Sequence, residues 1–133
     1  MPTEDLVREQ FAPWNTPNPV PFWDILPENM KLTVAGALNP CGGVYNTKAA
    51  SLEAFSSMAS RLGAPPESNI FNVLVSGDYA IVEMTFKCTT KKGNVYDQLN
   101  CFVVRYEGDK IVEARVYIDT AVEIAIYDQA DQA

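Results

Sequence analysis

The fold is decided by residues 95–118, which read VYDQLNCFVVRYEGDKIVEARVYI. Two apolar-rich runs, 95–106 and 111–118, flank a tight turn at 107–109. Runs of this kind on either side of a glycine-containing turn are typical of a β-hairpin. The hairpin leads directly into a short helical pattern, so we expect it to form one end of a small α+β domain.

Two further strands are predicted upstream of this hairpin. Residues 70–75 and 80–89 are separated by a Ser-Gly-Asp turn, and a Lys-Lys-Gly-Asn turn leads on to residue 95. The four runs predict an antiparallel meander. Residues 31–35 predict one more, brief strand.

The helical patterns lie mostly before the meander. A first helix is predicted to begin at Thr3, a short one to cover 22–26, and a longer one to follow Asn46 or Thr47. After the last strand, Thr120 and Glu123 have the spacing of a capping box. Helices and strands in separate runs predict an α+β fold, with helices on one face of an antiparallel sheet.

The composition limits the functions that the chain can have. A chain of 133 residues, 47% hydrophobic and 20% charged, predicts a single globular domain over 1–133. The net charge of −7 argues against nucleic acid. No histidine is present, and the three cysteines form no C-x-x-C pair, so we expect no metal and no cofactor. No signal peptide or apolar run of about 20 residues is apparent, which predicts a cytoplasmic protein and no membrane partner.

Several short motifs together resemble a known superfamily. They are WDIL (23–26), GVYNTKAA (43–50), GDYAIVE (77–83), YDQ (96–98) and YIDT (117–120). Their order and spacing are similar to those of the nuclear transport factor 2-like superfamily, and within it of SnoaL-like polyketide cyclases and small isomerases. The resemblance implies a cone-shaped α+β barrel: a strongly bent antiparallel sheet wraps around N-terminal helices and leaves a central pocket. It also implies a homodimer through the outer sheet face.

The catalytic acids of that superfamily are absent from the matching positions. The general base of ketosteroid isomerase would fall near Gly36, and its proton-donating acid at Phe102. The aspartate shared by SnoaL cyclases and limonene epoxide hydrolase would fall at Val116, and the hydrolase Arg–Asp pair at Glu83 and Thr85. The specific reactions of these relatives are therefore not implied.

Strand alternation leaves two interpretations of the sheet faces. In the first, the face with Val82 and Leu99 packs on the core, and the face with Glu83 and Asn100 meets water. In the second, which the resemblance favours, Glu83, Gln98 and Asn100 enter the pocket, while Val82, Met84, Phe86, Leu99 and Val103 form the dimer interface. Glu83 is then the candidate acid/base, with Gln98 and Asn100 holding an oxygen. The remaining predicted pocket residues are Trp23, Asp24, Tyr45, Thr85, Tyr96, Phe102, Val104, Ala114 and Val116.

The resulting hypothesis is a small metal-free acid/base enzyme, an isomerase, cyclase or dehydratase. By resemblance it would act on a hydrophobic polyketide- or terpenoid-type intermediate of secondary metabolism. The alternative is a non-catalytic ligand-binding or dimeric interaction module of the same fold. A third possibility, epoxide opening by water held between carboxylates, is weaker because the Arg–Asp pair is missing.

Overall fold

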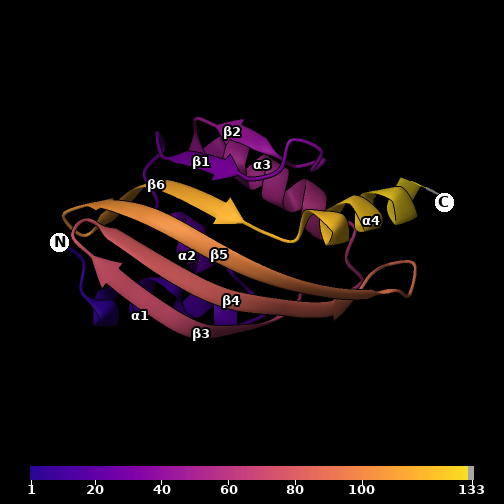
Figure 1. Cartoon of the computed structure of the whole chain (residues 1–133), viewed down its shortest axis with the longest axis horizontal. Helices are drawn as coiled ribbons and strands as arrows, with labels where there is room; N and C mark the ends of the chain where they lie inside the picture. The colour runs from indigo at the N-terminus through magenta and orange to yellow at the C-terminus, as the bar shows by residue number, and fades with distance from the viewer. Residues whose placement is uncertain (132–133) are drawn as a thin grey trace.

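A curved sheet forms the body of the molecule (Figure 1). The computed structural model describes residues 1–131, and within them six strands form one open sheet in the order β2-β1-β6-β5-β4-β3. The predicted meander is confirmed, with bounds β3 (Glu67–Ser76), β4 (Tyr79–Thr89), β5 (Val95–Glu107) and β6 (Lys110–Tyr117). The α+β class and the bent sheet are therefore as expected.

Two short strands extend this sheet beyond the predicted meander. β1 (Lys31–Val34) pairs in parallel with β6, and β2 (Gly43–Tyr45) pairs with β1 at the sheet edge. At the end of β1, Gly36 has a φ of +108° and lies against the start of the last helix. A Cβ there would come within 2.5 Å of the Thr120 side chain, so only glycine allows this close approach.

The helices cover the concave side of the sheet. Figure 1 shows α1 (Glu4–Phe11) and α2 (Val20–Asp24) behind the meander, and α3 (Lys48–Ala59) behind β1 and β2. A short 3₁₀ helix, η1 (Ala12–Asn15), joins α1 to the proline-rich connector, and α4 (Thr120–Asp131) follows β6. None of the helices described is long and apolar enough to cross a membrane.

Side-chain caps start three of these helices. Thr3 and Thr47 each accept a hydrogen bond of 3.1 Å from the backbone N–H three residues on, as the sequence predicts. At α4 the cap is Asp119, whose Oδ1 accepts from the N–H of Ala121 at 3.1 Å. The predicted cap at Thr120 is therefore wrong, and Glu123 is released for another role.

The pairing of β4 with β5 corrects both interpretations of the sheet faces. Met84 lies directly opposite Asn100, and Phe86 opposite Gln98. Directly paired residues point to the same side of a sheet, so the apolar side of β4 joins the amides of β5 on the concave face. Glu83 pairs with Cys101 and faces outward. Both interpretations place Glu83 on the same face as Asn100, which requires the pairing of β4 with β5 to be shifted by one residue. A shift of one residue moves every side chain of a strand to the opposite face.

The core is a cluster of aromatic rings between this concave face and the helices. Trp14 makes close ring contacts with Phe22, Phe55 and Phe86, with centroids 5.4–5.7 Å apart. Burying a large apolar side chain contributes about 1.5–3 kcal/mol. These rings therefore hold η1, α2 and α3 on the sheet.

Candidate functional site

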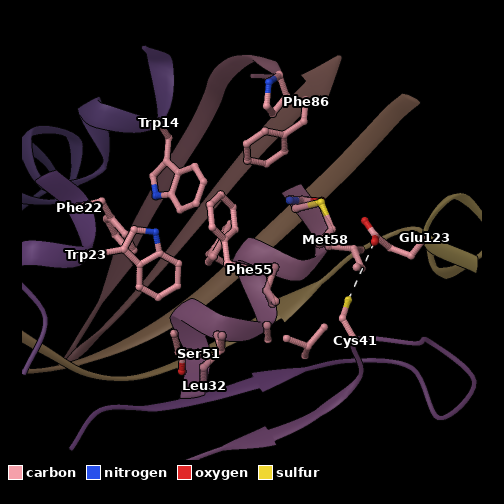
Figure 2. A pocket seen from close by; sticks show the side chains of 18 of the residues that line it. Trp14, Phe22, Trp23, Leu32, Cys41, Ser51, Phe55, Met58, Phe86 and Glu123 are labelled. Atoms are coloured by element: carbon pink, nitrogen blue, oxygen red, sulfur yellow. Dashed lines mark hydrogen bonds between the residues drawn. The ribbon is translucent and has the colours of Figure 1, made fainter. Parts of the chain in front are cut away.

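A cavity of about 100 Å³ lies between the concave face of the sheet and the helices (Figure 2). Its walls come from η1, α2, α3, β1 and the loop after it, strands β4–β6 and α4. Most of its lining side chains are apolar or aromatic. The polar exceptions are Cys41, Ser51, Tyr96, Asn100 and Glu123.

Glu123 is the buried carboxylate of this cavity. It projects from the first turn of α4 and is only 2% exposed. The Tyr96 hydroxyl donates to its Oε1 at 2.5 Å, and the Gln98 amide donates to the same oxygen at 3.2 Å. Its other oxygen, Oε2, lies 3.9 Å from the sulfur of Cys41 (Figure 2). Tyr96 and Gln98 therefore hold Oε1 firmly, whereas Oε2 accepts only a long hydrogen bond from the weakly donating Cys41 thiol.

Gln98 fixes the position of this carboxylate. The Gln98 side chain is fully buried, and its Oε1 accepts from the backbone N–H of Asp119 at 2.6 Å. Its Nε2 donates to the Asp119 carbonyl at 3.1 Å as well as to Glu123. All three bonds agree with one orientation of the amide. Gln98 thus ties the start of α4 to β5 and sets the direction in which Glu123 points.

The surroundings of Glu123 favour protonated groups. Burial raises the pKa of Glu123, although the hydrogen bonds from Tyr96 and Gln98 oppose the rise. Burial and the nearby Glu123 charge also raise the pKa of Tyr96, which therefore keeps its proton. The same two causes raise the pKa of Cys41 to about 11. A thiol with that pKa is a poor nucleophile at neutral pH. Glu123 is thus the titrating group best suited to proton transfer in this lining.

The raised pKa of Glu123 predicts a pH-dependent stability. Folded protein holds this proton more tightly than unfolded protein does, so the free energy of unfolding is highest where the carboxyl is protonated in both states. It falls as the pH rises through the folded pKa. Glu123→Gln stays neutral and avoids this loss, which is about 1.4 kcal/mol for each unit by which the folded pKa exceeds the unfolded one.

Urea unfolding of both proteins between about pH 4 and about pH 8 measures this effect. We expect the stability of Glu123→Gln relative to the wild type to increase with pH. A difference that stays constant over this range would contradict the assignment of a raised pKa to Glu123.

Several residues predicted from the sequence do meet at this cavity. Those that line it are Trp23, Tyr96, Asn100, Phe102, Ala114 and Val116. Gln98 and Val104 are fully buried on the same inner face, outside the lining itself. Tyr45 is also outside the lining, and its hydroxyl donates to the carbonyl of Cys41 at 2.7 Å.

Three predicted positions in the pocket are wrong. Glu83 lies on the outer face, where the Asn72 amide donates to its Oε1 at 2.8 Å. Thr85 pairs with Leu99 and shares that outer face. Asp24 is exposed, because α2 turns its neighbours Phe22 and Trp23 inward instead. The carboxylate that does line the cavity is Glu123 of α4.

The sequence contains a signal for Glu123 that the capping-box interpretation concealed. Glu123 precedes Ile126 by three residues and Tyr127 by four, which places it on their side of a helix. Ile126 is buried and Tyr127 packs against the core. A carboxylate within the apolar stripe of a helix is unusual and indicates a buried, partnered acid.

Within the described part of the chain, three buried polar atoms around the cavity have no hydrogen-bond partner. They are the indole nitrogens of Trp14 and Trp23 and the side-chain oxygen of Asn100. Buried polar atoms are normally hydrogen-bonded, and exceptions are common where a ligand or water binds. Rotation of the Asn100 amide by 180° would present its NH₂ group instead. The cavity can therefore recognise an oxygen-bearing molecule.

The described residues do not form a metal site. Among them, no group of three or more His, Cys, Asp or Glu side chains is close enough to hold a metal ion. The chemistry available in this cavity is that of one carboxylate, its two donors and the unpartnered amide and indole groups.

No protein-family model and no curated protein sequence matches the chain. Solved structures do match. A nuclear transport factor 2-like protein of Burkholderia thailandensis has 20% identity and a TM-score of 0.77, with 100% of each chain covered. A Catenulispora acidiphila protein with a ketosteroid isomerase-like fold, in complex with trimethylamine, has 14% identity and a TM-score of 0.72, with 98% of each chain covered. TerC, co-crystallised with polyporic acid, has 13% identity and a TM-score of 0.75, with 96% of each chain covered.

These likenesses define the class of fold. The chain has the nuclear transport factor 2-like fold, as its motifs predict, in a form whose sheet remains open. At identities of 13–20% the comparison concerns the fold. The activity must be argued from the residues of the cavity.

Proposed function

We propose that the chain is a small acid/base enzyme that moves a proton on a mostly apolar molecule bound beside Glu123. One observation carries the proposal. The cavity is apolar except for a few polar groups, and its buried carboxylate has one oxygen held by Tyr96 and Gln98 and the other 3.9 Å from the weakly donating thiol of Cys41. A carboxylate with a raised pKa in such a site is suited to proton abstraction next to a carbonyl.

In the proposed reaction, Oε2 of ionised Glu123 takes a proton from a carbon next to the substrate carbonyl. The C–H electron pair moves toward the carbonyl oxygen and forms an enolate. Asn100 lies two residues from Gln98 on the same strand face, about 7 Å away, and its amide would bind that oxygen. Returning the proton to another carbon completes an isomerisation. If the substrate carries a hydroxyl on the β-carbon, the enolate instead expels it, and the proton held by Glu123 lets it leave as water, which is a dehydration.

The substrate class follows from the apolar lining and from the resemblance to SnoaL-like enzymes. We propose a hydrophobic polyketide- or terpenoid-type intermediate of cytoplasmic secondary metabolism. Two proteins of this fold have been crystallised with small molecules, trimethylamine in one and polyporic acid in the other. These complexes support the use of the fold as a container for a small molecule.

We also propose a homodimer formed through the outer sheet face. This face exposes Leu74, Leu99 and Tyr117, and Leu99 is 56% exposed. Large exposed apolar side chains on one face are a common sign of association. Val82, Met84 and Phe86, which strand alternation predicts at this interface, point inward. Sedimentation velocity distinguishes the dimer from a monomer.

A ligand carrier is the second candidate function. The raised pKa values of Tyr96 and Cys41 favour it, because both groups keep their protons at neutral pH. Neither of them can then act as a second base beside Glu123. A carrier would bind apolar ligands and leave their carbon-bound protons in place. The experiment below separates the two functions.

The test uses 2-tetralone, a compact apolar ketone with acidic protons next to its carbonyl. Both tryptophans of the chain line the cavity, so their fluorescence reports binding. We expect 2-tetralone to change this fluorescence and to exchange its C1 protons for deuterium in D₂O faster than in buffer, as followed by proton NMR. Binding without faster exchange would favour the carrier. An unchanged tryptophan fluorescence would show that 2-tetralone does not bind, which would contradict both functions.

A further inference from the structure

A second hollow lies against the cavity on the side of its aromatic wall. This groove has a volume of about 360 Å³ and runs between the proline-rich connector after η1 and the loop between α3 and β3. It is lined mainly by proline, alanine and leucine side chains, together with three aromatic rings. The residues that bound both spaces are Trp14, Phe55, Pro66 and Phe86.

The wall between the two spaces is made of side chains rather than backbone. The rings of Trp14 and Phe55 meet edge to face with centroids 5.5 Å apart, and those of Trp14 and Phe86 at 5.7 Å. Phe55 is only partly buried. Figure 2 shows Trp14 and Phe55 at one side of the cavity and Glu123 with Cys41 at the other. A rotation of Phe55 would therefore extend the cavity at the end away from Glu123.

The size of the inner cavity is the reason to expect this extension. Sites for small organic molecules usually measure roughly 300–1,000 Å³, and the inner cavity measures about 100 Å³. It is large enough for the reacting end of a substrate. The groove adds the missing volume, and its apolar lining is suited to a hydrocarbon chain.

We infer that the substrate is an elongated ketone-like molecule whose reactive end lies beside Glu123 and whose apolar tail passes Phe55 into the groove beside Pro17, Pro19 and Leu62. This inference rests on the proposed function for the identity of the reacting end. The tail is recognised by apolar contact alone, so its length governs affinity.

A series of 2-alkanones, from 2-butanone to 2-undecanone, tests the inference through tryptophan fluorescence. In the wild type we expect affinity to rise with chain length by about fourfold for each methylene that enters the groove. Ala59→Phe fills the groove from the end of α3 and should make affinity independent of length beyond the shortest ketones. Ala49→Phe is the matched control, because Ala49 is exposed on the same helix, outside both spaces.

A second variant guards against a folding defect at Ala59. Ala64→Phe places a ring in the groove from an exposed loop position, where a larger side chain is easily accommodated. Loss of the length dependence in both groove variants, with Ala49→Phe like the wild type, supports the inference. Equal slopes in all four proteins overturn it.

The experiment also separates this inference from the proposed function. Length-dependent binding that the groove variants remove supports the tail site even if 2-tetralone shows no proton exchange. Conversely, exchange of 2-tetralone without any length dependence among the 2-alkanones overturns the tail site and leaves the proposed function standing. No binding of any 2-alkanone overturns the tail site.

Discussion

Replacing Glu123 with glutamine is expected to slow the proton exchange of 2-tetralone by at least about 100-fold, the lower end of what a positioned acid or base contributes. The change keeps the shape of the side chain, and the new amide oxygen can still accept from Tyr96 and Gln98, as Oε1 does. Only the ionisable group is removed. Tryptophan fluorescence should show binding of 2-tetralone within about twofold of the wild type, since uniform binding is not affected.

The matched control for this variant is Glu83→Gln. Glu83 lies on the outer face of the sheet and is hydrogen-bonded to Asn72. The same chemical change there should leave the exchange rate of 2-tetralone as it is in the wild type. A Glu123→Gln protein that retains half of the wild-type rate, or a Glu83→Gln protein that loses it, would contradict the assignment of Glu123 as the base.

The pH dependence of the exchange gives an independent check on Glu123. Only the ionised carboxylate can take the proton, so the rate falls as the pH drops through the pKa of Glu123. Because burial raises that pKa, we expect the fall to occur at a higher pH than for an ordinary glutamate. The residual rate of Glu123→Gln should lack this step.

The fold could be predicted from the sequence because its signals are local. Alternating strands joined by short glycine turns predict the meander, and Thr3 and Thr47 are recognisable caps. The parallel pairing of β1 with β6 was not predictable in this way. It joins segments about eighty residues apart, and four-residue strands carry little pattern of their own.

The site was predicted in part, and the reason lies in the register. Alternation within β5 correctly grouped Gln98, Asn100 and Phe102 on one face. Alternation groups the residues of one strand into two faces. Which face of the neighbouring strand lies on the same side of the sheet depends on the pairing of the two strands. Glu83 was therefore assigned to the wrong side. Glu123 was missed because its spacing from Thr120 also fits a cap, and only the packing of α4 against β5 separates the two roles.

Replacing Gln98 with leucine is expected to lower the free energy of unfolding by about 2–4 kcal/mol. The substitution removes three hydrogen bonds, two to the backbone of Asp119 and one to Glu123. Leucine fills a similar volume, so the loss comes mainly from polar groups that are left without partners in a buried place. Urea unfolding at neutral pH measures the change.

Gln10→Leu is the comparison that separates this effect from the loss of any glutamine. Gln10 also makes two hydrogen bonds, accepting from Tyr106 at 2.7 Å and donating to the carbonyl of Asp109 at 2.8 Å, but it lies near the surface of α1. We expect Gln10→Leu to cost about 1–2 kcal/mol, less than Gln98→Leu, since it removes two hydrogen bonds rather than three and water can reach the exposed Asp109 carbonyl. Equal losses in the two variants would mean that the Gln98 amide has no special part in holding α4.

A role for Gln98 in positioning the acid also predicts a change that a purely structural role would not produce. Its hydrogen bond lowers the pKa of Glu123. Gln98→Leu should therefore raise that pKa further and move the pH step of 2-tetralone exchange upward, while Gln10→Leu leaves the step in place. If the step stays at the wild-type pH in Gln98→Leu, the amide supports the helix without tuning the carboxylate, and Tyr96 alone holds Oε1.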